Sequence, residues 1–193
     1  MLLNILIPTL PERKERFEQL IDNLNNQIAD CNAEHEVSII SDCSPRPEHG
    51  GITTGEKRNR LLERATAEYV WQVDCDDIIL PKSIECILKA CRTGCDVIGI
   101  NGFMTTNGKD KVDWEIRLNN PYIATERDGL TIYLRHPNHI TPMKSKHAKK
   151  IKFEHINLGE DYKWACALKE AGLLKTQEII NEPIYHYDYR TTK

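Results

Sequence analysis

Residues 69–77 read YVWQVDCDD, an apolar segment that leads directly into three carboxylates within four residues. Residues 69–73 are typical of a buried β-strand. Because side chains alternate along an extended chain, Asp74 and Asp76 are expected on one side. Two such carboxylates suit a hard divalent cation that also binds substrate phosphates. The alternative is a solvated acidic start to the helix that Pro81 is expected to open. The apolar strand immediately before the acids favours the functional interpretation.

The sequence around this segment alternates between predicted strands and predicted helices. We expect strands over residues 2–7, 35–41, 69–73 and 96–101. We expect helices over residues 12–28, 56–67, 81–92 and 159–171. Further along, residues 103–117 predict a hairpin around Asn107-Gly108, and residues 176–187 are expected to be extended. The alternation implies βαβ units, and therefore an α/β fold with a mostly parallel sheet.

Polar residues follow three of the predicted strands at the point where each one ends. Pro8, Thr9 and Glu12 follow the first strand, Asp42 follows the second, and the acids from Asp74 onward follow the third. Ligands of open α/β sheets bind beyond the carboxyl ends of the strands. If these strands are parallel, all three groups meet at one edge, and the sequence therefore predicts a binding site there.

Residues 55–60, GEKRNR, begin a predicted helix with basic side chains. One interpretation is simply a solvated helix start. However, basic residues in a first turn oppose the helix dipole. They are better explained by a bound anion such as a diphosphate, which an arginine binds through two hydrogen bonds.

Composition and charge narrow the class of protein. The chain has 193 residues, 40% of them hydrophobic, and a net charge of −3, so no global field favours nucleic acid or anionic membranes. No apolar stretch approaches the roughly 18 residues that span a bilayer. The seven cysteines form no regular framework, which favours free thiols in a reducing compartment. We therefore expect a cytoplasmic protein.

Four segments, in this order, resemble family 2 glycosyltransferases with the GT-A fold: ILIPTLPERKE (5–15), IISDCS (39–44), the run 55–77, and GEDYKWACAL (159–168). The similarity extends from about residue 3 to residue 170, although residues 105–155 match little. It implies one GT-A domain over residues 1–193. Residues 1–105 would form its nucleotide-sugar-binding half, and residues 106–193 its acceptor-side half, a small β/α extension.

The resemblance also implies roles for particular residues. Asp74-Cys75-Asp76 matches the DxD element of the family, in which Asp76 would bind Mn²⁺ or Mg²⁺ and Asp74 would contact the donor ribose or the metal. Asp42 would bind the base of the donor. The full set of donor-binding residues implied in this way is Pro8, Thr9, Glu12, Asp42, Arg58, Asn59, Asp74 and Cys75.

Asp161 is the candidate catalytic residue. On the residues alone, Glu160 and Asp161 are explained as favourable acids at a helix N-terminus. By resemblance, however, Gly159-Glu160-Asp161 matches the family's ED element, whose Asp is the general base of inverting members. A carboxylate there would take the proton of the acceptor hydroxyl as that oxygen attacks the sugar.

Histidines and lysines of the second half allow several interpretations. By resemblance to some GT-A enzymes, a late His such as His186 would complete the metal site, while an ordinary structural role is equally compatible with its sequence. His136 and His139 would line the acceptor side or make structural hydrogen bonds. The five lysines within residues 144–152 indicate a solvated helix face, or a surface that meets a phosphate-bearing acceptor.

The resemblance predicts an enzyme that transfers a hexosyl group from a nucleotide diphosphate sugar, with a UDP-sugar as the expected donor. The acceptor would be a hydroxyl group on a glycan, a lipid-linked sugar or a modified DNA base. A sugar nucleotidyltransferase is one alternative, although the expected Gly-rich phosphate loop is absent from the sequence. A non-catalytic module that binds nucleotides or sugars is the other.

Overall fold

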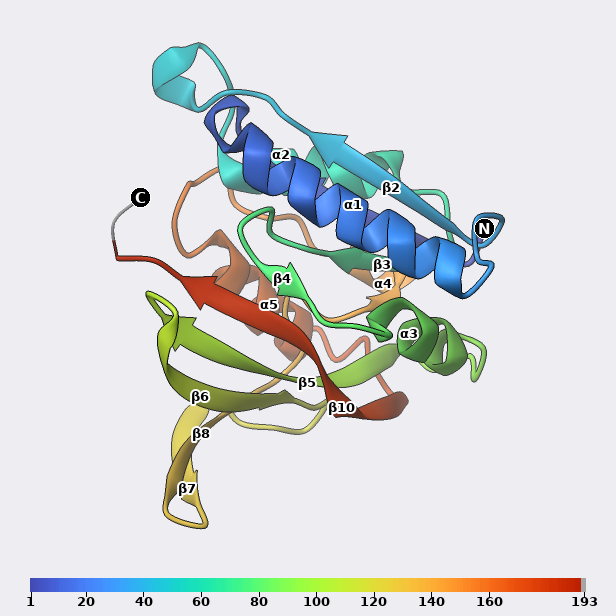
Figure 1. Ribbon diagram of the computed structural model, residues 1–193, viewed down its shortest axis with the longest axis vertical. Helices are drawn as coiled ribbons and strands as arrows, with labels where there is room; N and C mark the ends of the chain where they lie inside the picture. Colours follow the sequence, from blue (N-terminus) through green and yellow to red (C-terminus); the bar gives the residue numbers. More distant parts are fainter. Residues whose placement is uncertain (192–193) are drawn as a thin grey trace.

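A ten-stranded sheet organises the computed structural model, which describes residues 1–191 (Figure 1). Its strands are β1 (Leu3–Pro8), β2 (Val37–Asp42), β3 (Tyr69–Gln72), β4 (Ile78–Ile79), β5 (Val97–Thr106), β6 (Lys109–Ile116), β7 (Ile123–Arg127), β8 (Leu130–Arg135), β9 (Met143–Lys144) and β10 (Gln177–Tyr189). The order across the sheet is β2-β1-β3-β9-β5-β6-β8-β7, and β10 pairs with both β4 and β5.

The first three strands, β1, β2 and β3, run parallel to one another. β1 lies between β2 and β3 and is parallel to both, with Leu3 opposite Val37 and Tyr69. Pro8 at the end of β1 is paired with Asp42 at the end of β2, and β3 ends nearby at Gln72. The predicted convergence of the three strand ends at one edge is therefore confirmed.

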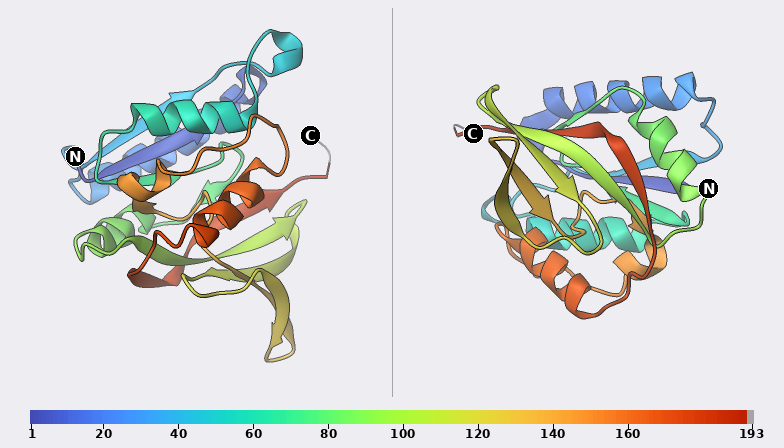
Figure 2. Two further views of the ribbon diagram at one scale, coloured as in Figure 1. Left: turned by 180° about the vertical axis from the view of Figure 1, so that it is seen from behind. Right: turned by 90° about the horizontal axis from the view of Figure 1, so that it is seen from below.

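Helices cover both faces of the sheet (Figure 2). They are α1 (Lys14–Asp30), α2 (Thr54–Arg64), α3 (Ser83–Cys91), α4 (Ser145–Ala148) and α5 (Glu160–Glu170), with short 3₁₀ turns η1 (Pro11–Arg13) and η2 (Pro47–His49). α1 and α3 lie on one face, and α2, α4 and α5 lie on the other. The predicted α/β fold with flanking helices is thus confirmed.

Alternation along β1 explains how one strand serves both layers. Leu3, Ile5 and Ile7 pack in the cluster that contains the apolar faces of α1 and α3. Leu6, which points the other way, packs with Leu61 of α2 and with residues of α4 and α5. All residues of β1 are buried, as expected for a strand covered on both faces.

The second half contains both the predicted hairpin and elements that the sequence did not indicate. β5 and β6 form the hairpin, and Asn107 and Gly108 both have the positive φ angles that its tight turn requires. A second hairpin, β7–β8, projects from the body of the molecule (Figure 1). The short β9 inserts antiparallel between β3 and β5. Within residues 1–191, no helix has the length and apolar character needed to cross a lipid bilayer.

Asp96, just before β5, ties the two halves of the chain together. One of its carboxylate oxygens accepts hydrogen bonds from the backbone N–H groups of Lys175 and Thr176, at 2.9 and 3.2 Å. The other lies 3.0 Å from His147 Nε2. Although burial acts in the opposite direction, these partners lower the pKa of Asp96 to about 2. The start of β10 is thereby fixed beside β5.

We predict that Asp96 contributes to the loss of stability in acid. Because its folded-state pKa is depressed, its stabilising contribution is present above its ordinary pKa of 3.8 and is lost as the pH falls toward 2. The melting temperature of Asp96→Asn should therefore fall less steeply than that of the wild type between pH 4 and pH 2. Asp113→Asn, at an exposed position, is the control and should follow the wild-type curve. Identical slopes for Asp96→Asn and wild type would contradict this role.

Candidate functional site

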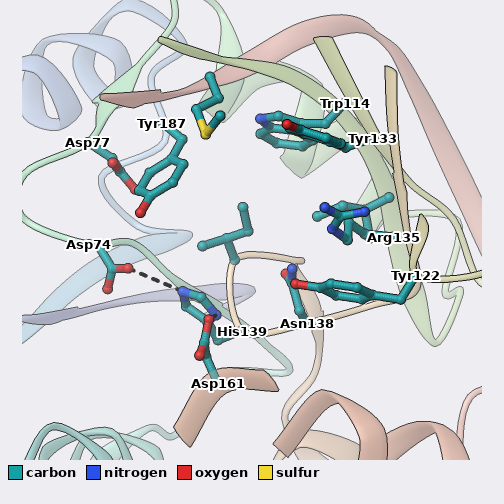
Figure 3. A pocket seen from close by; sticks show the side chains of 13 residues that line it. Asp74, Asp77, Trp114, Tyr122, Tyr133, Arg135, Asn138, His139, Asp161 and Tyr187 are labelled. Carbon is teal, nitrogen blue, oxygen red and sulfur yellow. Dashed lines mark hydrogen bonds and ion pairs between the residues drawn. The ribbon is translucent and has the colours of Figure 1, made fainter. Parts of the chain in front are cut away.

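Two cavities open beside the carboxyl ends of β1 and β3. The polar cavity, about 440 Å³, is lined by Pro8, Thr9, Arg13, Lys57, Arg58 and Asp76, among others. The aromatic cavity, about 300 Å³, is lined by Trp114, Tyr122, Tyr133, Arg135, Asn138 and His139, among others (Figure 3). Asp74, Asp161 and Tyr187 line both. Molecules bound in the two cavities would therefore meet at these three side chains.

Arg58, on α2, is a buried guanidinium that connects the end of β3 with the start of α5. It donates hydrogen bonds to Asp74 Oδ1 at 2.8 Å, to Glu160 Oε1 at 3.2 Å and to Gln72 Oε1 at 3.2 Å. Only 3% of the residue is exposed. Burial opposes the charge of Arg58, but the carboxylates of Asp74 and Glu160 outweigh it and raise the pKa of Arg58. Arg58 thus forms a charged, desolvated unit with Asp74 and Glu160.

His139 continues this chain of polar side chains toward Asp161. Its Nε2 lies 3.2 Å from Asp74 Oδ2, and its Nδ1 lies 3.6 Å from Asp161 Oδ2. Burial alone would raise the pKa of Asp74, but Arg58 and His139 hold it well below its usual range. Asp74 is therefore a permanent anion at neutral pH. The ionic chain, defined as Glu160, Arg58, Asp74, His139 and Asp161, runs from the buried side of the polar cavity to its junction with the aromatic cavity.

Asp77, the third acid of the cluster, is buried, and it also lines the aromatic cavity. Its carboxylate accepts hydrogen bonds from the Tyr185 hydroxyl at 2.6 Å and from the Asp188 backbone N–H at 3.3 Å. Burial, together with the nearby charge of Asp74, raises the pKa of Asp77 well above its usual range. Asp74 and Asp77 therefore have different states: Asp74 is held ionised, while the protonated form of Asp77 is favoured.

Asp76 is the acid that faces the polar cavity with the fewest protein contacts. Its Oδ2 forms an ion pair with Arg13 Nη1 at 2.9 Å. Residues 74–77 form a turn after β3, since the backbone N–H of Asp77 donates to the carbonyl of Asp74 at 3.1 Å, and the cluster is not extended as expected. Asp74 and Asp76 nevertheless both line the polar cavity, as the sequence predicted.

The residues present fit a divalent cation only if a bound phosphate supplies further oxygen ligands to that cation. Within residues 1–191, no group of three or more His, Cys, Asp or Glu side chains is arranged to hold a metal ion. Asp76 could supply one hard oxygen ligand in a cavity that Arg13 and Lys57 also line. Mg²⁺ is commonly bound by one or two carboxylates together with substrate phosphates, which is the arrangement that Asp76 allows.

The structure does not bring His186 to this site. Its ring stacks on Phe103, with centroids 4.4 Å apart, and its Nε2 lies 2.8 Å from Thr105 Oγ1. Phe103 and Thr105 face away from the cavities, whereas the intervening Met104 lines the aromatic cavity. Alternation along β10 instead directs the next residue, Tyr187, into both cavities. The expectation that His186 would join Asp76 at a metal therefore stays a prediction, and these contacts do not support it.

The donor residues implied by the resemblance fall into two groups. Pro8, Thr9, Arg58 and Asp74 line the polar cavity. Four others are not among its lining residues: Glu12, Asp42, Asn59 and Cys75. Glu12 is exposed and lies 3.7 Å from Arg46, Asp42 accepts hydrogen bonds from Ser44, and Cys75 is buried beneath Arg13. These three flank the cavity without contributing to its wall.

Asn59 has a structural position instead of a place in the cavity wall. Its side-chain amide bonds both backbone groups of Phe153, donating to the carbonyl and accepting from the N–H, each at 2.9 Å. Gly55 allows the same close approach of the two segments, because a Cβ at that position would collide with the carbonyl oxygen of Glu154. Together they hold the segment after Phe153, which leads to Gly159 and α5, against the start of α2.

Lysines of residues 144–152 do not form the expected helix face. α4 contains only four residues of this run. Lys149 donates to the backbone carbonyl of Ala65 at 2.6 Å, and Lys152 pairs with Glu63 at 2.7 Å. None of these lysines lines either cavity.

Several side chains of the site were not among the residues selected from the sequence. Tyr187, Arg13 and Lys57 line the polar cavity, and Lys57 Nζ donates to the carbonyl of Thr9 at 2.5 Å. The basic helix start pointed to the neighbourhood of Lys57. His139 was considered for the acceptor side, and the structure places it in the aromatic cavity. No sequence motif marked Tyr122 or Tyr133.

Comparison with known proteins identifies the fold. No protein-family model matches the chain, and no curated protein matches it in sequence. Among solved structures, S. aureus TarS (residues 1–349) in complex with UDP-GlcNAc superposes with a TM-score of 0.65 at 15% identity, over 100% of this chain and 60% of that one. Its complex with UDP gives a TM-score of 0.64 at 14% identity, over 97% and 60%.

The chain therefore shares the fold of S. aureus TarS, and the GT-A fold expected from the sequence is confirmed. It spans about 60% of the length of these TarS structures. The strands and helices that carry the two cavities lie within this common fold.

We predict that Arg58→Met lowers the free energy of unfolding by about 3–5 kcal/mol, because it leaves the buried carboxylate of Glu160 and the partly buried carboxylate of Asp74 without their cation. Arg60→Met is the matched control on the same helix. Arg60 forms an exposed pair with Glu56, and its loss should change stability by less than about 1 kcal/mol. Urea denaturation of both variants measures the difference. Equal stabilities of the two variants would show that the ionic chain does not stabilise the fold.

Proposed function

We propose that this protein is a metal-dependent glycosyltransferase that moves a hexosyl group from a nucleotide diphosphate sugar to an acceptor hydroxyl with inversion. A UDP-sugar is the proposed donor, Mn²⁺ or Mg²⁺ the proposed cofactor, and Asp161 the proposed general base. The observation that carries the proposal is the position of Asp161 and Asp74 on the shared wall of two cavities of different chemistry.

The polar cavity suits the nucleotide diphosphate. Arg13, Arg46 and Lys57 line it, and cations of this kind bind phosphate oxygens. Lys57 is buried, and desolvation lowers its pKa, which a bound anion would reverse. The fold that this chain shares with TarS, solved with UDP and with UDP-GlcNAc, supports the same choice of donor.

The position of Asp161 supports its proposed role in activating the acceptor. Its side chain is 40% exposed, so it remains open to a bound hydroxyl, while His139 faces one of its oxygens. In the proposed reaction, Asp161 takes the hydroxyl proton as the oxygen bonds to the anomeric carbon. The bond from that carbon to the diphosphate breaks on the opposite face, and the configuration inverts.

The polar cavity would stabilise the leaving nucleotide diphosphate. Arg13 and Lys57 would hold the phosphates as negative charge develops on them. A divalent ion held by Asp76 and the phosphates would supply further charge stabilisation at the leaving diphosphate. Arg13, which pairs with Asp76 here, would then be available to the phosphate oxygens.

The cytoplasmic location expected from the cysteines stays a prediction.

We predict that Asp161→Asn lowers the turnover of the donor about 10²–10⁴-fold, because the amide cannot accept the proton, while nucleotide affinity stays unchanged. Released nucleotide is measured over a panel of UDP-, GDP- and dTDP-sugars with Mn²⁺, and affinity is measured by calorimetry. Glu154→Gln, an exposed acid before α5 that pairs with Lys163, is the matched control and should turn over donor normally. Full activity of Asp161→Asn would remove Asp161 as the base. Nucleotide binding without turnover by the wild type would favour a binding module.

A further inference from the structure

We propose, on the basis of the function above, that the aromatic cavity binds an acceptor consisting of a sugar ring with an anionic group, and that Arg135 binds the anion. The anion would be a carboxylate or a phosphate. Arg135 would act as a specificity-determining residue, and Asp161 would face the hydroxyl that reacts.

The cavity has the size and walls expected for one ring. Its volume of about 300 Å³ is at the small end of ligand sites, which are mostly apolar with a few polar groups. Trp114 on β6, Tyr133 on β8 and Tyr122 before β7 supply flat rings. The C–H faces of a sugar ring pack against such surfaces, while its hydroxyls reach Asn138 and the acids.

Arg135 is the charged group of this wall that lacks a charged partner. Its guanidinium lies between two rings, 4.1 Å from the centroid of Tyr122 and 4.8 Å from that of Tyr133. One terminal nitrogen donates to the carbonyls of Ile123 and Leu134, at 2.8 and 2.9 Å. Across residues 1–191, Arg135 makes no ion pair with a carboxylate. Its other nitrogens are therefore available to an anion.

Other arginines near the site are already neutralised. Arg58 pairs with Asp74 and Glu160, Arg13 pairs with Asp76, and Arg127 on the β7–β8 hairpin pairs with Glu115. The two rings fix the orientation of Arg135, which lowers the entropy lost when it binds a ligand. A guanidinium that is fixed, partly buried and without an acid is a favourable site for a carboxylate or phosphate.

The charges at the two ends of the cavity define how the acceptor lies. Figure 3 shows Arg135 on one side and Asp74, Asp161 and His139 on the other. An anionic acceptor bound the wrong way round would place its charge beside Asp74 and Asp161 and be repelled. With its anion at Arg135, the same ring directs a hydroxyl toward Asp161. The field of the cavity therefore selects both the acceptor and its orientation.

A nucleic-acid acceptor is less consistent with these surfaces. The lysines of residues 144–152 lie outside both cavities, and Lys149 and Lys152 already contact Ala65 and Glu63. A base-modifying enzyme needs a basic surface that follows the phosphate backbone beside its pocket. The single guanidinium of Arg135 instead suits a small acceptor unit with one anionic group.

The test compares three matched acceptors with one donor: a methyl hexoside, the corresponding methyl hexuronide and the corresponding hexoside 6-phosphate. The wild type should show kcat/KM about ten- to a hundred-fold higher for one or both anionic acceptors than for the neutral one. Arg135→Gln should abolish this advantage, and Arg135→Lys should keep part of it. The carboxylate and phosphate compounds distinguish the two sources of the anion.

Arg127→Gln is the matched control, because Arg127 lies on the same hairpin but pairs with Glu115 outside the cavity, and it should keep the full advantage. Melting temperatures establish that each variant is folded, and Arg135→Lys provides the comparison if Arg135→Gln is not. Equal kcat/KM for neutral and anionic acceptors, an unchanged advantage in Arg135→Gln, or transfer only to DNA would overturn the proposal while leaving glycosyl transfer intact. Absence of donor turnover with every acceptor and with water would instead overturn the proposed function.

Discussion

The site depends on the ionic chain that the buried guanidinium of Arg58 organises. Arg58 is carried by α2, Asp74 follows β3, and Glu160 begins α5, so one side chain joins three elements that are up to 102 residues apart. A buried arginine with this environment is stable only while both carboxylates remain beside it. Its geometry therefore fixes the position of Asp74 and the start of α5, which carries Asp161.

This constraint also divides the site into two environments. On one side of Asp74, cations line the polar cavity and favour phosphate. On the other side, aromatic rings line a smaller cavity in which Arg135 is the charged group opposite the acids. Asp161 stands where the two meet and is less buried than Asp74, so it stays accessible to a ligand. A group-transfer reaction needs such a junction, because donor and acceptor must approach each other while the rest of each is held.

Much of the polar cavity was predictable because it depends on local sequence. Two of its features can be recognised from a few consecutive residues: a strand that ends in acids, and a helix that starts with Lys57 and Arg58. The parallel topology brings these two segments together. The position of Asn59 was not predictable in this way. Its partner, Phe153, lies 94 residues away, and nothing near Asn59 distinguishes a contact with a nucleotide from a contact with backbone.

The aromatic cavity was hidden for a related reason. Its walls come from β5, β6, β8 and β10. The turn of the β5–β6 hairpin is visible in the sequence, but the pairings of β5 with β10 and of β6 with β8 leave no motif. The choice between His186 and Tyr187 also depended on register. β10 has irregularities between Ile179 and Tyr185, so counting along the sequence does not reveal which residues face the site. The structure resolves this by directing Tyr187, and not His186, toward Asp74.

The most direct test of the central claim is a crystal structure of the protein with UDP and Mn²⁺ bound. The account predicts that the diphosphate lies in the polar cavity beside Arg13, Lys57 and Asp76, with its terminal phosphate directed toward Asp74 and the junction with the aromatic cavity. Nucleotide bound elsewhere on the molecule, or in the aromatic cavity, would contradict the assignment of donor and acceptor sides on which the proposed reaction rests.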